Sequence, residues 1–117
     1  MKKPPFNKSL LYSIKGLFWM LKSERNFQLE VLALLINLFL IVYFKLNFTD
    51  AALIFVVCFL VLVTEIINTA IEKICDFVEP NFNEKIGLIK DLAAGSVITA
   101  TLLSIIVGIL VYTKYLF

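Results

Sequence analysis

The sequence predicts an all-α integral membrane protein with one amphipathic helix at the membrane surface and three transmembrane helices. Hydrophobic residues make up 61% of the 117 residues, and the mean hydropathy is +0.94. A soluble domain of this size needs a more polar exterior, so the composition indicates a membrane protein. We expect residues 1–117 to form a single membrane domain. The net charge of +2 and the absence of a basic block argue against nucleic-acid binding.

The segment before the first apolar run has the pattern of an interfacial helix over about residues 6–28. Lys8, Lys15 and Lys22 repeat every seven residues on one face, and Trp19 and Tyr12 are candidate interfacial anchors. Apolar residues recur at helical spacing on another face: Leu10, Leu11, Ile14, Leu17, Phe18 and Leu21.

Three apolar runs then predict transmembrane helices over about residues 29–47, 51–78 and 90–114. The first run is short for a bilayer of about 30 Å, so it must include Leu29 and Leu46 and needs Lys45 or Glu30 to snorkel. Asp50 is the expected N-cap of the second helix. The third contains 21 residues without a formal charge, 92–112. Pro80 and the polar residues after it separate the last two helices.

Lysine and arginine counts predict the orientation. Six lie before the first span, Lys45 is alone in the first loop, and the second loop region contains Lys73, Lys85 and Lys90. The positive-inside rule therefore puts the N-terminus and the second loop in the cytoplasm and the C-terminus outside.

Acidic residues in the second span are the strongest indication of a functional site. Glu65, Glu72 and Asp76 fall within about 40° of one another on a helix, and Asn68 lies about 60° from Glu65. A charged side chain at membrane depth costs roughly 2.5–3.5 kcal/mol on insertion scales, so a functional role is the default interpretation. Apolar residues flank Glu65 and Asn68 on both sides, which favours a functional role for these two residues.

These residues suit phosphoryl transfer. Glu65 and Glu72 lie about 10 Å apart along the axis, so we assign them separate roles: Glu65 as a general base and Glu72 as a ligand of Mg²⁺. Glu24 supplies a second carboxylate if the interfacial helix folds over this end, and Lys90 is a candidate for holding phosphate oxygens. Simpler interpretations are a solvated helix end at Glu72 and a helix start at Lys90 and Asp91. Cys58 and Cys75 are interpreted as ordinary buried thiols.

Two segments resemble signatures of the prokaryotic diacylglycerol kinase family, which includes undecaprenol kinases. Residues 65–76 resemble its E-x-x-N-(S/T)-A-(I/V)-E-x-x-x-D signature, and residues 90–97 resemble its K-D signature. Ser23, Glu24, Phe27 and Glu30 resemble the segment after the amphipathic helix of that family.

This resemblance implies a multi-pass kinase of the bacterial inner membrane that transfers the γ-phosphoryl group of ATP to a lipid hydroxyl, working as a homotrimer with shared sites. It implies that Glu65 is the catalytic base, that Glu24 and Glu72 bind Mg²⁺, and that Asp76 has a supporting role. The implied lipid-binding residues are Glu30, Glu65 and Asn68, and the implied nucleotide-binding residues are Tyr12, Glu24, Glu72, Asn81, Asn83, Lys90 and Asp91. Some members have an arginine where Pro5 stands here, and Lys3 or Lys8 is a candidate replacement.

Alternatives remain at this stage. Diacylglycerol, which would give phosphatidic acid, and undecaprenol both present a primary hydroxyl to the same site. A small proton-coupled transporter would explain Glu65 but not the set formed by Glu24, Glu72, Asp76, Lys90 and Asp91. A non-catalytic membrane subunit would explain none of them.

Overall fold

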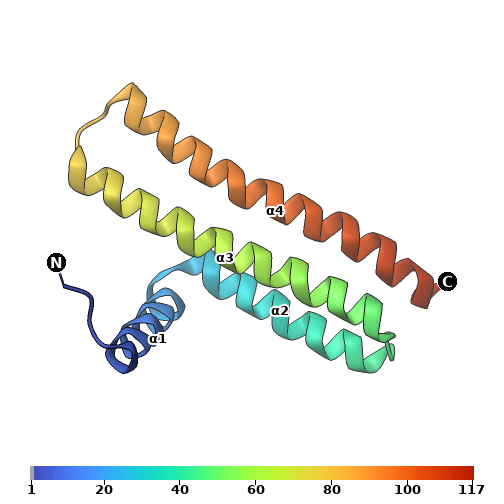
Figure 1. Ribbon diagram of the computed structural model, residues 1–117. Coiled ribbons are helices and arrows are strands. Elements are labelled where there is room, and N and C mark those ends of the chain that lie inside the picture. Colours follow the sequence, from blue (N-terminus) through green and yellow to red (C-terminus); the bar gives the residue numbers. More distant parts are fainter. Residues whose placement is uncertain (1) are drawn as a thin grey trace.

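A computed structural model describes residues 2–117 as four helices (Figure 1). They are α1 (Phe6–Ser23), α2 (Arg25–Tyr43), α3 (Phe48–Val78) and α4 (Glu84–Leu116). The last three are long and apolar enough to cross a membrane. The predicted all-α fold with three membrane spans is therefore confirmed.

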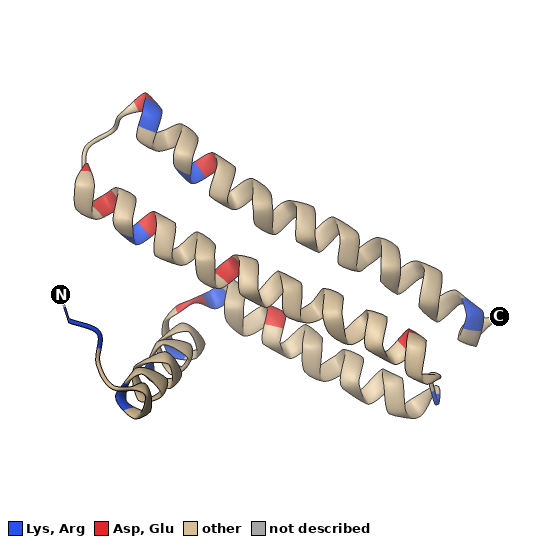
Figure 2. Cartoon of the chain, viewed as in Figure 1, with Lys and Arg blue, Asp and Glu red and all other residues tan. Residues whose placement is uncertain are grey.

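The long helix α3 lies in the middle of the bundle and packs against both α4 and α2, whereas α1 turns away from their common direction and contacts α2 (Figure 1). The N-terminus and the α3–α4 connection lie at one end of the bundle. The C-terminus and the α2–α3 connection lie at the other end. Charged residues gather towards these two ends and are sparse along the middle of α3 and α4 (Figure 2).

The boundary between α1 and α2 lies at Glu24. This residue has extended backbone angles, φ −106° and ψ 111°, so the helix predicted to run to about residue 28 is broken there and the chain changes direction. The buried residues Met20 and Phe27, on either side of the bend, pack with Leu34 of α2 and Leu62 of α3. The bend therefore attaches the surface helix to the core of the bundle.

The prediction that Asp50 caps the second membrane helix was wrong. Asn47 is the N-cap, and its Oδ1 accepts a hydrogen bond from the backbone N–H of Asp50 at 2.8 Å. The carboxylate of Asp50 instead accepts from Lys114 Nζ at 2.9 Å and from the Tyr115 hydroxyl at 2.7 Å. The Asp50 side chain, which the local sequence favoured as the helix cap, thus binds Lys114 and Tyr115 of α4 instead.

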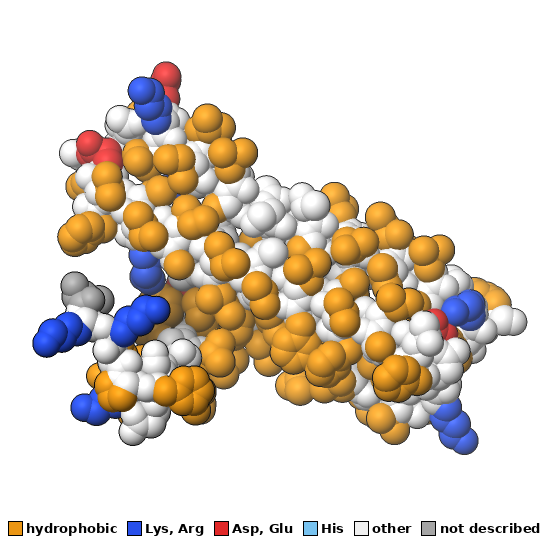
Figure 3. Space-filling model, viewed as in Figure 1, with side chains coloured by type: hydrophobic (Ala, Val, Ile, Leu, Met, Phe, Trp, Pro, Cys, Tyr) orange, Lys and Arg blue, Asp and Glu red, His pale blue; other side chains and the backbone are white. Residues whose placement is uncertain are grey.

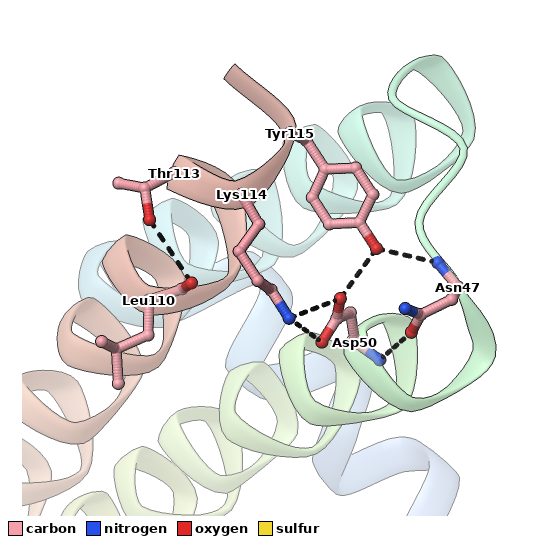
Figure 4. A network of polar contacts seen from close by, with 6 residues as sticks. All are labelled: Asn47, Asp50, Leu110, Thr113, Lys114 and Tyr115. Atoms are coloured by element: carbon pink, nitrogen blue, oxygen red, sulfur yellow. Dashed lines mark hydrogen bonds and ion pairs between the residues drawn. The ribbon is translucent and has the colours of Figure 1, made fainter. Parts of the chain in front are cut away.

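These contacts form a polar network at the C-terminal end of the bundle (Figure 4). The Tyr115 hydroxyl also accepts a hydrogen bond from the backbone N–H of Asn47 at 3.1 Å. Nearby, the Tyr112 hydroxyl donates to Asn37 Oδ1 at 2.7 Å and joins α4 to α2. Together these bonds fix the last turn of α4 against the start of α3 and hold the register of the three long helices.

The last helix begins earlier than expected. Asn83 caps α4 by accepting hydrogen bonds from the N–H groups of Lys85 and Ile86 at 2.9 and 3.3 Å. Lys90 and Asp91 consequently lie in the second turn of α4, and the interpretation of this pair as a helix start was wrong.

Most large apolar side chains point outward. Space-filling side chains of this type cover much of the visible face of the long helices (Figure 3), and residues such as Phe39, Val56 and Leu110 are each 60% exposed or more. Contact of this apolar surface with water would be unfavourable. Lipid chains or neighbouring subunits can cover it instead.

Candidate active site

Acidic side chains from α2, from α3 and from the bend between α1 and α2 come together near the middle and final part of α3. Glu65 is only 3% exposed, although it carries a carboxyl group. The Glu30 carboxyl of α2 lies close enough to interact with it electrostatically. Glu24 and Glu72 lie within electrostatic range of Glu65 as well. The fold therefore gathers four residues that were singled out from separate segments of the sequence.

A bond between two carboxyl groups needs a proton from one of them. When both Glu30 and Glu65 are ionised, their oxygens repel, and Glu30 Oε2 is buried without a hydrogen-bond donor among residues 2–117. An unsatisfied buried polar atom is costly and rare in native proteins. Glu30 Oε2 is therefore placed to accept a hydrogen bond from a donor that residues 2–117 do not supply, such as a hydroxyl group.

Asn68 lies one helical turn beyond Glu65 and is also buried. Its Nδ2 donates to Glu72 Oε1 at 3.2 Å, which fixes the direction of a carboxylate that is otherwise exposed at the rim. Its Oδ1 is buried and has no donor in the described chain. Asn68 thus binds the rim carboxylate of Glu72 and keeps a buried acceptor oxygen one helical turn from Glu65.

Glu24 and Glu72 are the residues available for a divalent cation. Among residues 2–117, no three His, Cys, Asp or Glu side chains are arranged to hold a metal together. Mg²⁺ is often bound through one or two carboxylates, with water and substrate phosphates completing its shell. The donor chemistry of this pair fits such an ion.

At the same end of the bundle, Lys90 Nζ of α4 forms an ion pair with Asp76 Oδ1 of α3 at 2.6 Å. Both side chains are substantially exposed, 39% and 64% respectively. The pair holds an ammonium group in place on the α4 side. The neighbouring Asp91 is exposed.

The other residues predicted to bind nucleotide remain apart from the acidic cluster within one chain. Tyr12 is exposed on α1, with the ammonium of Lys15 5.9 Å from its ring centre. Asn81 lies in the α3–α4 connection, where its backbone N–H donates to Glu79 Oε1, and Asn83 Oδ1 is used as the α4 cap. No hydrogen bond within residues 2–117 joins these three to the cluster.

The structure also reveals a cavity of about 410 Å³ that the sequence did not predict. It runs between α2, α3 and α4, with the acid Glu30 and the polar Asn37 on its α2 wall and mostly apolar residues elsewhere. Thr101 and Ser104 line it too, but their hydroxyls donate to backbone carbonyls of α4. Asn37 in the first apolar run was the available signal, because polar residues are uncommon there. The lining is mostly apolar, with the carboxyl of Glu30 and the amide of Asn37 on one wall.

Comparison with known proteins decides between the remaining interpretations. Residues 11–112 match the family described as prokaryotic diacylglycerol kinase. The chain belongs to this family. It is therefore a lipid kinase with ATP as donor, and the transporter and non-catalytic interpretations are excluded.

Similar proteins carry two different names. A diacylglycerol kinase of Helicobacter pylori is 33% identical over 109 residues, which cover 93% of this chain and 82% of the relative. An undecaprenol kinase of Bacillus subtilis is 29% identical over 107 residues, covering 92% and 87% respectively. The prokaryotic diacylglycerol kinase family thus establishes lipid phosphorylation, while the acceptor lipid belongs to the proposal below.

Proposed function

We propose that this kinase transfers the γ-phosphoryl group of Mg²⁺-bound ATP to the primary hydroxyl of diacylglycerol, giving phosphatidic acid. The observation that carries this proposal is the buried Glu65 carboxyl, which faces Glu30 where the apolar cavity begins. A lipid lying along that cavity would present its hydroxyl to two acids. Undecaprenol is the second candidate acceptor, since it offers the same hydroxyl and one similar protein is an undecaprenol kinase.

In this proposal Glu65 is the catalytic base. It accepts the hydroxyl proton while the lipid oxygen attacks the γ-phosphorus, and the bond to the bridging oxygen of ADP breaks on the opposite side. Glu30 and the free Oδ1 of Asn68 hold the hydroxyl in position. Burial among apolar side chains excludes water, which would otherwise compete with the lipid for the phosphoryl group.

The polar rim handles the phosphates. Glu24 and Glu72 would hold Mg²⁺, which would neutralise negative charge on the ATP phosphates. Asn68 keeps the Glu72 carboxylate directed towards this site, and Asp76 holds the Lys90 ammonium ready for phosphate oxygens. Tyr12, Asn81, Asn83 and Asp91 would contact the rest of the nucleotide.

Two features support a homotrimer with sites shared between subunits. Much of the apolar surface has no partner in one chain. No hydrogen bond within residues 2–117 joins the proposed nucleotide residues on α1 and in the α3–α4 connection to the acidic cluster. A neighbouring subunit can cover the apolar surface and can bring its own nucleotide residues to the acidic cluster. Chemical crosslinking in membranes tests this arrangement. We expect the largest crosslinked species on a denaturing gel to contain three copies of the chain.

The proposed topology puts the N-terminus in the cytoplasm and the C-terminus outside, in the bacterial inner membrane, with residues 1–117 acting as one domain. The N-terminus and the α3–α4 connection share one end of the bundle (Figure 1), and most basic residues lie there (Figure 2). That end would face cytoplasmic ATP.

An assay with purified protein tests the proposed function. Radiolabelled γ-phosphate from ATP should appear in phosphatidic acid when diacylglycerol and Mg²⁺ are present in mixed micelles. Undecaprenol in parallel micelles reveals the second candidate, and whichever acceptor has the larger kcat/KM is the preferred one. Label transfer to neither lipid by the wild-type enzyme would refute the proposal.

A further inference from the structure

A second hollow, of about 500 Å³, lies between the surface helix α1 and the final half of α3. It is separate from the cavity beside Glu30. Its apolar lining includes Leu17 and Met20 of α1 and Ile66 of α3. Its polar lining includes Thr69 and Lys73 of α3, and Trp19 of α1 faces them. We refer to this hollow as the α1–α3 cleft.

The only cation lining the cleft, among residues 2–117, rests on an aromatic ring. Lys73 Nζ lies 4.4 Å from the centre of the Trp19 ring, so the ammonium of α3 and the indole of α1 close one side of the cleft. The adjacent carboxylate of Glu72 is engaged by Asn68, and Lys73 has no ion pair within the described chain. A cation–π contact at an exposed site is weak. The ammonium is therefore free to move onto a stronger, anionic partner.

Two further lysines lie near Trp19 but outside the cleft. Lys15 and Lys22 lie one turn before and one turn after Trp19 and border a shallow hollow with it. No aspartate or glutamate occurs in residues 1–23, so α1 contributes only positive charge to this side. The cleft thus combines an apolar floor with one lysine in its lining, and two further lysines of α1 lie just beyond its Trp19 wall.

An amphiphile with an anionic head matches that combination. A nucleotide would satisfy the lysines but leave the floor formed by Leu17, Met20 and Ile66 without an apolar partner. Interfacial helices such as α1 lie at the depth of lipid phosphates, and clustered lysines there attract anionic headgroups. We propose that the α1–α3 cleft binds the phosphate head of a membrane lipid, with Lys73 moving from Trp19 onto the phosphate.

Two kinds of lipid could supply the phosphate group. One is a phosphomonoester lipid, which is the type of product a lipid kinase makes, and the other is an anionic phospholipid with a phosphodiester. Trp19 is the only tryptophan in the chain, so its fluorescence reports directly on the cleft. The test uses full-length protein in phosphatidylcholine nanodiscs with increasing fractions of phosphatidic acid or, separately, of phosphatidylglycerol.

We expect a saturable change in Trp19 emission as the anionic fraction rises. Lys73→Gln removes a charge-assisted contact, so it should abolish the emission change or require roughly tenfold more anionic lipid. Lys73→Arg keeps the charge and should retain the change. Lys85→Gln removes an exposed lysine at the same end of the bundle and should leave the response unchanged. A stronger response to phosphatidic acid identifies a product site, and equal responses identify a general anionic-phospholipid site.

Three results would overturn the proposal. They are an unchanged titration in Lys73→Gln, an equal loss in Lys85→Gln, and an emission change of the same size when Mg²⁺ and ATP are added in neutral nanodiscs. The fluorescence readout needs no phosphoryl transfer. Its failure is therefore distinguishable from failure of the proposed kinase reaction.

Discussion

The amide of Asn68 donates to the carboxylate of Glu72 across 3.2 Å, one helical turn along α3. This bond joins the buried part of the acidic cluster to its exposed rim, because Asn68 is 7% exposed while Glu72 is open to solvent. The geometry implies that the two residues act as a unit rather than independently. The first prediction follows from that coupling.

Asn68→Ala and Glu72→Ala should not be additive. Each change removes the same oriented carboxylate from the site, so the double variant should lose less activity than the product of the single losses. Contacting residues typically show coupling of about 0.5–3 kcal/mol in such cycles. kcat/KM for ATP in the four proteins measures it, and full additivity would mean that the bond has no role in orienting Glu72.

Glu65→Gln should leave the protein folded and inserted but nearly abolish turnover. The amide has almost the same shape as the acid but cannot accept the hydroxyl proton. We expect kcat to fall more than tenfold, which corresponds to more than about 1.4 kcal/mol of barrier. Nucleotide binding should survive, since Glu65 meets the lipid acceptor. Glu84→Gln, an exposed change at the start of α4, is the matched control, and retention of more than about a tenth of kcat would refute the base assignment.

Glu72→Ala and Glu24→Ala should each raise the Mg²⁺ concentration needed for half-maximal activity. A site with two carboxylates loses one of its two protein ligands in either variant, and water replaces a charged oxygen poorly. Chelation with EDTA should stop the wild-type reaction, and excess Mg²⁺ should restore it. Titrations of activity against Mg²⁺ measure the shift, with Glu84→Ala as control. Curves that coincide with the wild type in both variants would exclude the two-carboxylate site.

Tyr115→Phe should destabilise the fold without changing the chemistry. It removes the hydroxyl that donates to Asp50 and accepts from the Asn47 backbone (Figure 4). Two lost hydrogen bonds cost about 1–3 kcal/mol. Tyr43→Phe is the control, because the exposed Tyr43 hydroxyl makes no hydrogen bond within the described residues. Unfolding in detergent measures the difference, and kcat per folded enzyme should stay constant since the network lies at the opposite end of α3 from Glu72.

The sequence predicted the parts of this structure that depend on local pattern. Three apolar runs are sufficient to define three spans, and the acidic stripe on one face of α3 follows from helical geometry. Features that depend on distant partners were missed. Nothing near Asp50 indicates that Tyr115 and Lys114 will bind its carboxylate. Because they do, Asn47 caps the helix in place of Asp50. The cation–π contact between Trp19 and Lys73 likewise joins helices whose packing no local pattern reveals.

The final prediction concerns topology. The ATP-dependent reaction needs Glu72 and Lys90 on the cytoplasmic side, and both lie towards the end of the bundle that holds the N-terminus and the α3–α4 connection (Figure 1). Phe82, in that connection, is 91% exposed and caps no helix, whereas Phe117 lies at the C-terminus and is fully exposed. Single cysteines at these positions, in a background without Cys58 and Cys75, can be labelled in intact cells with a membrane-impermeant thiol reagent. We expect Phe117→Cys to react at once and Phe82→Cys to react only after the membrane is opened, because the six basic residues before the first span predict a cytoplasmic location for that end. Rapid labelling of Phe82→Cys from outside would separate the phosphate-handling residues from cytoplasmic ATP and contradict the proposed orientation.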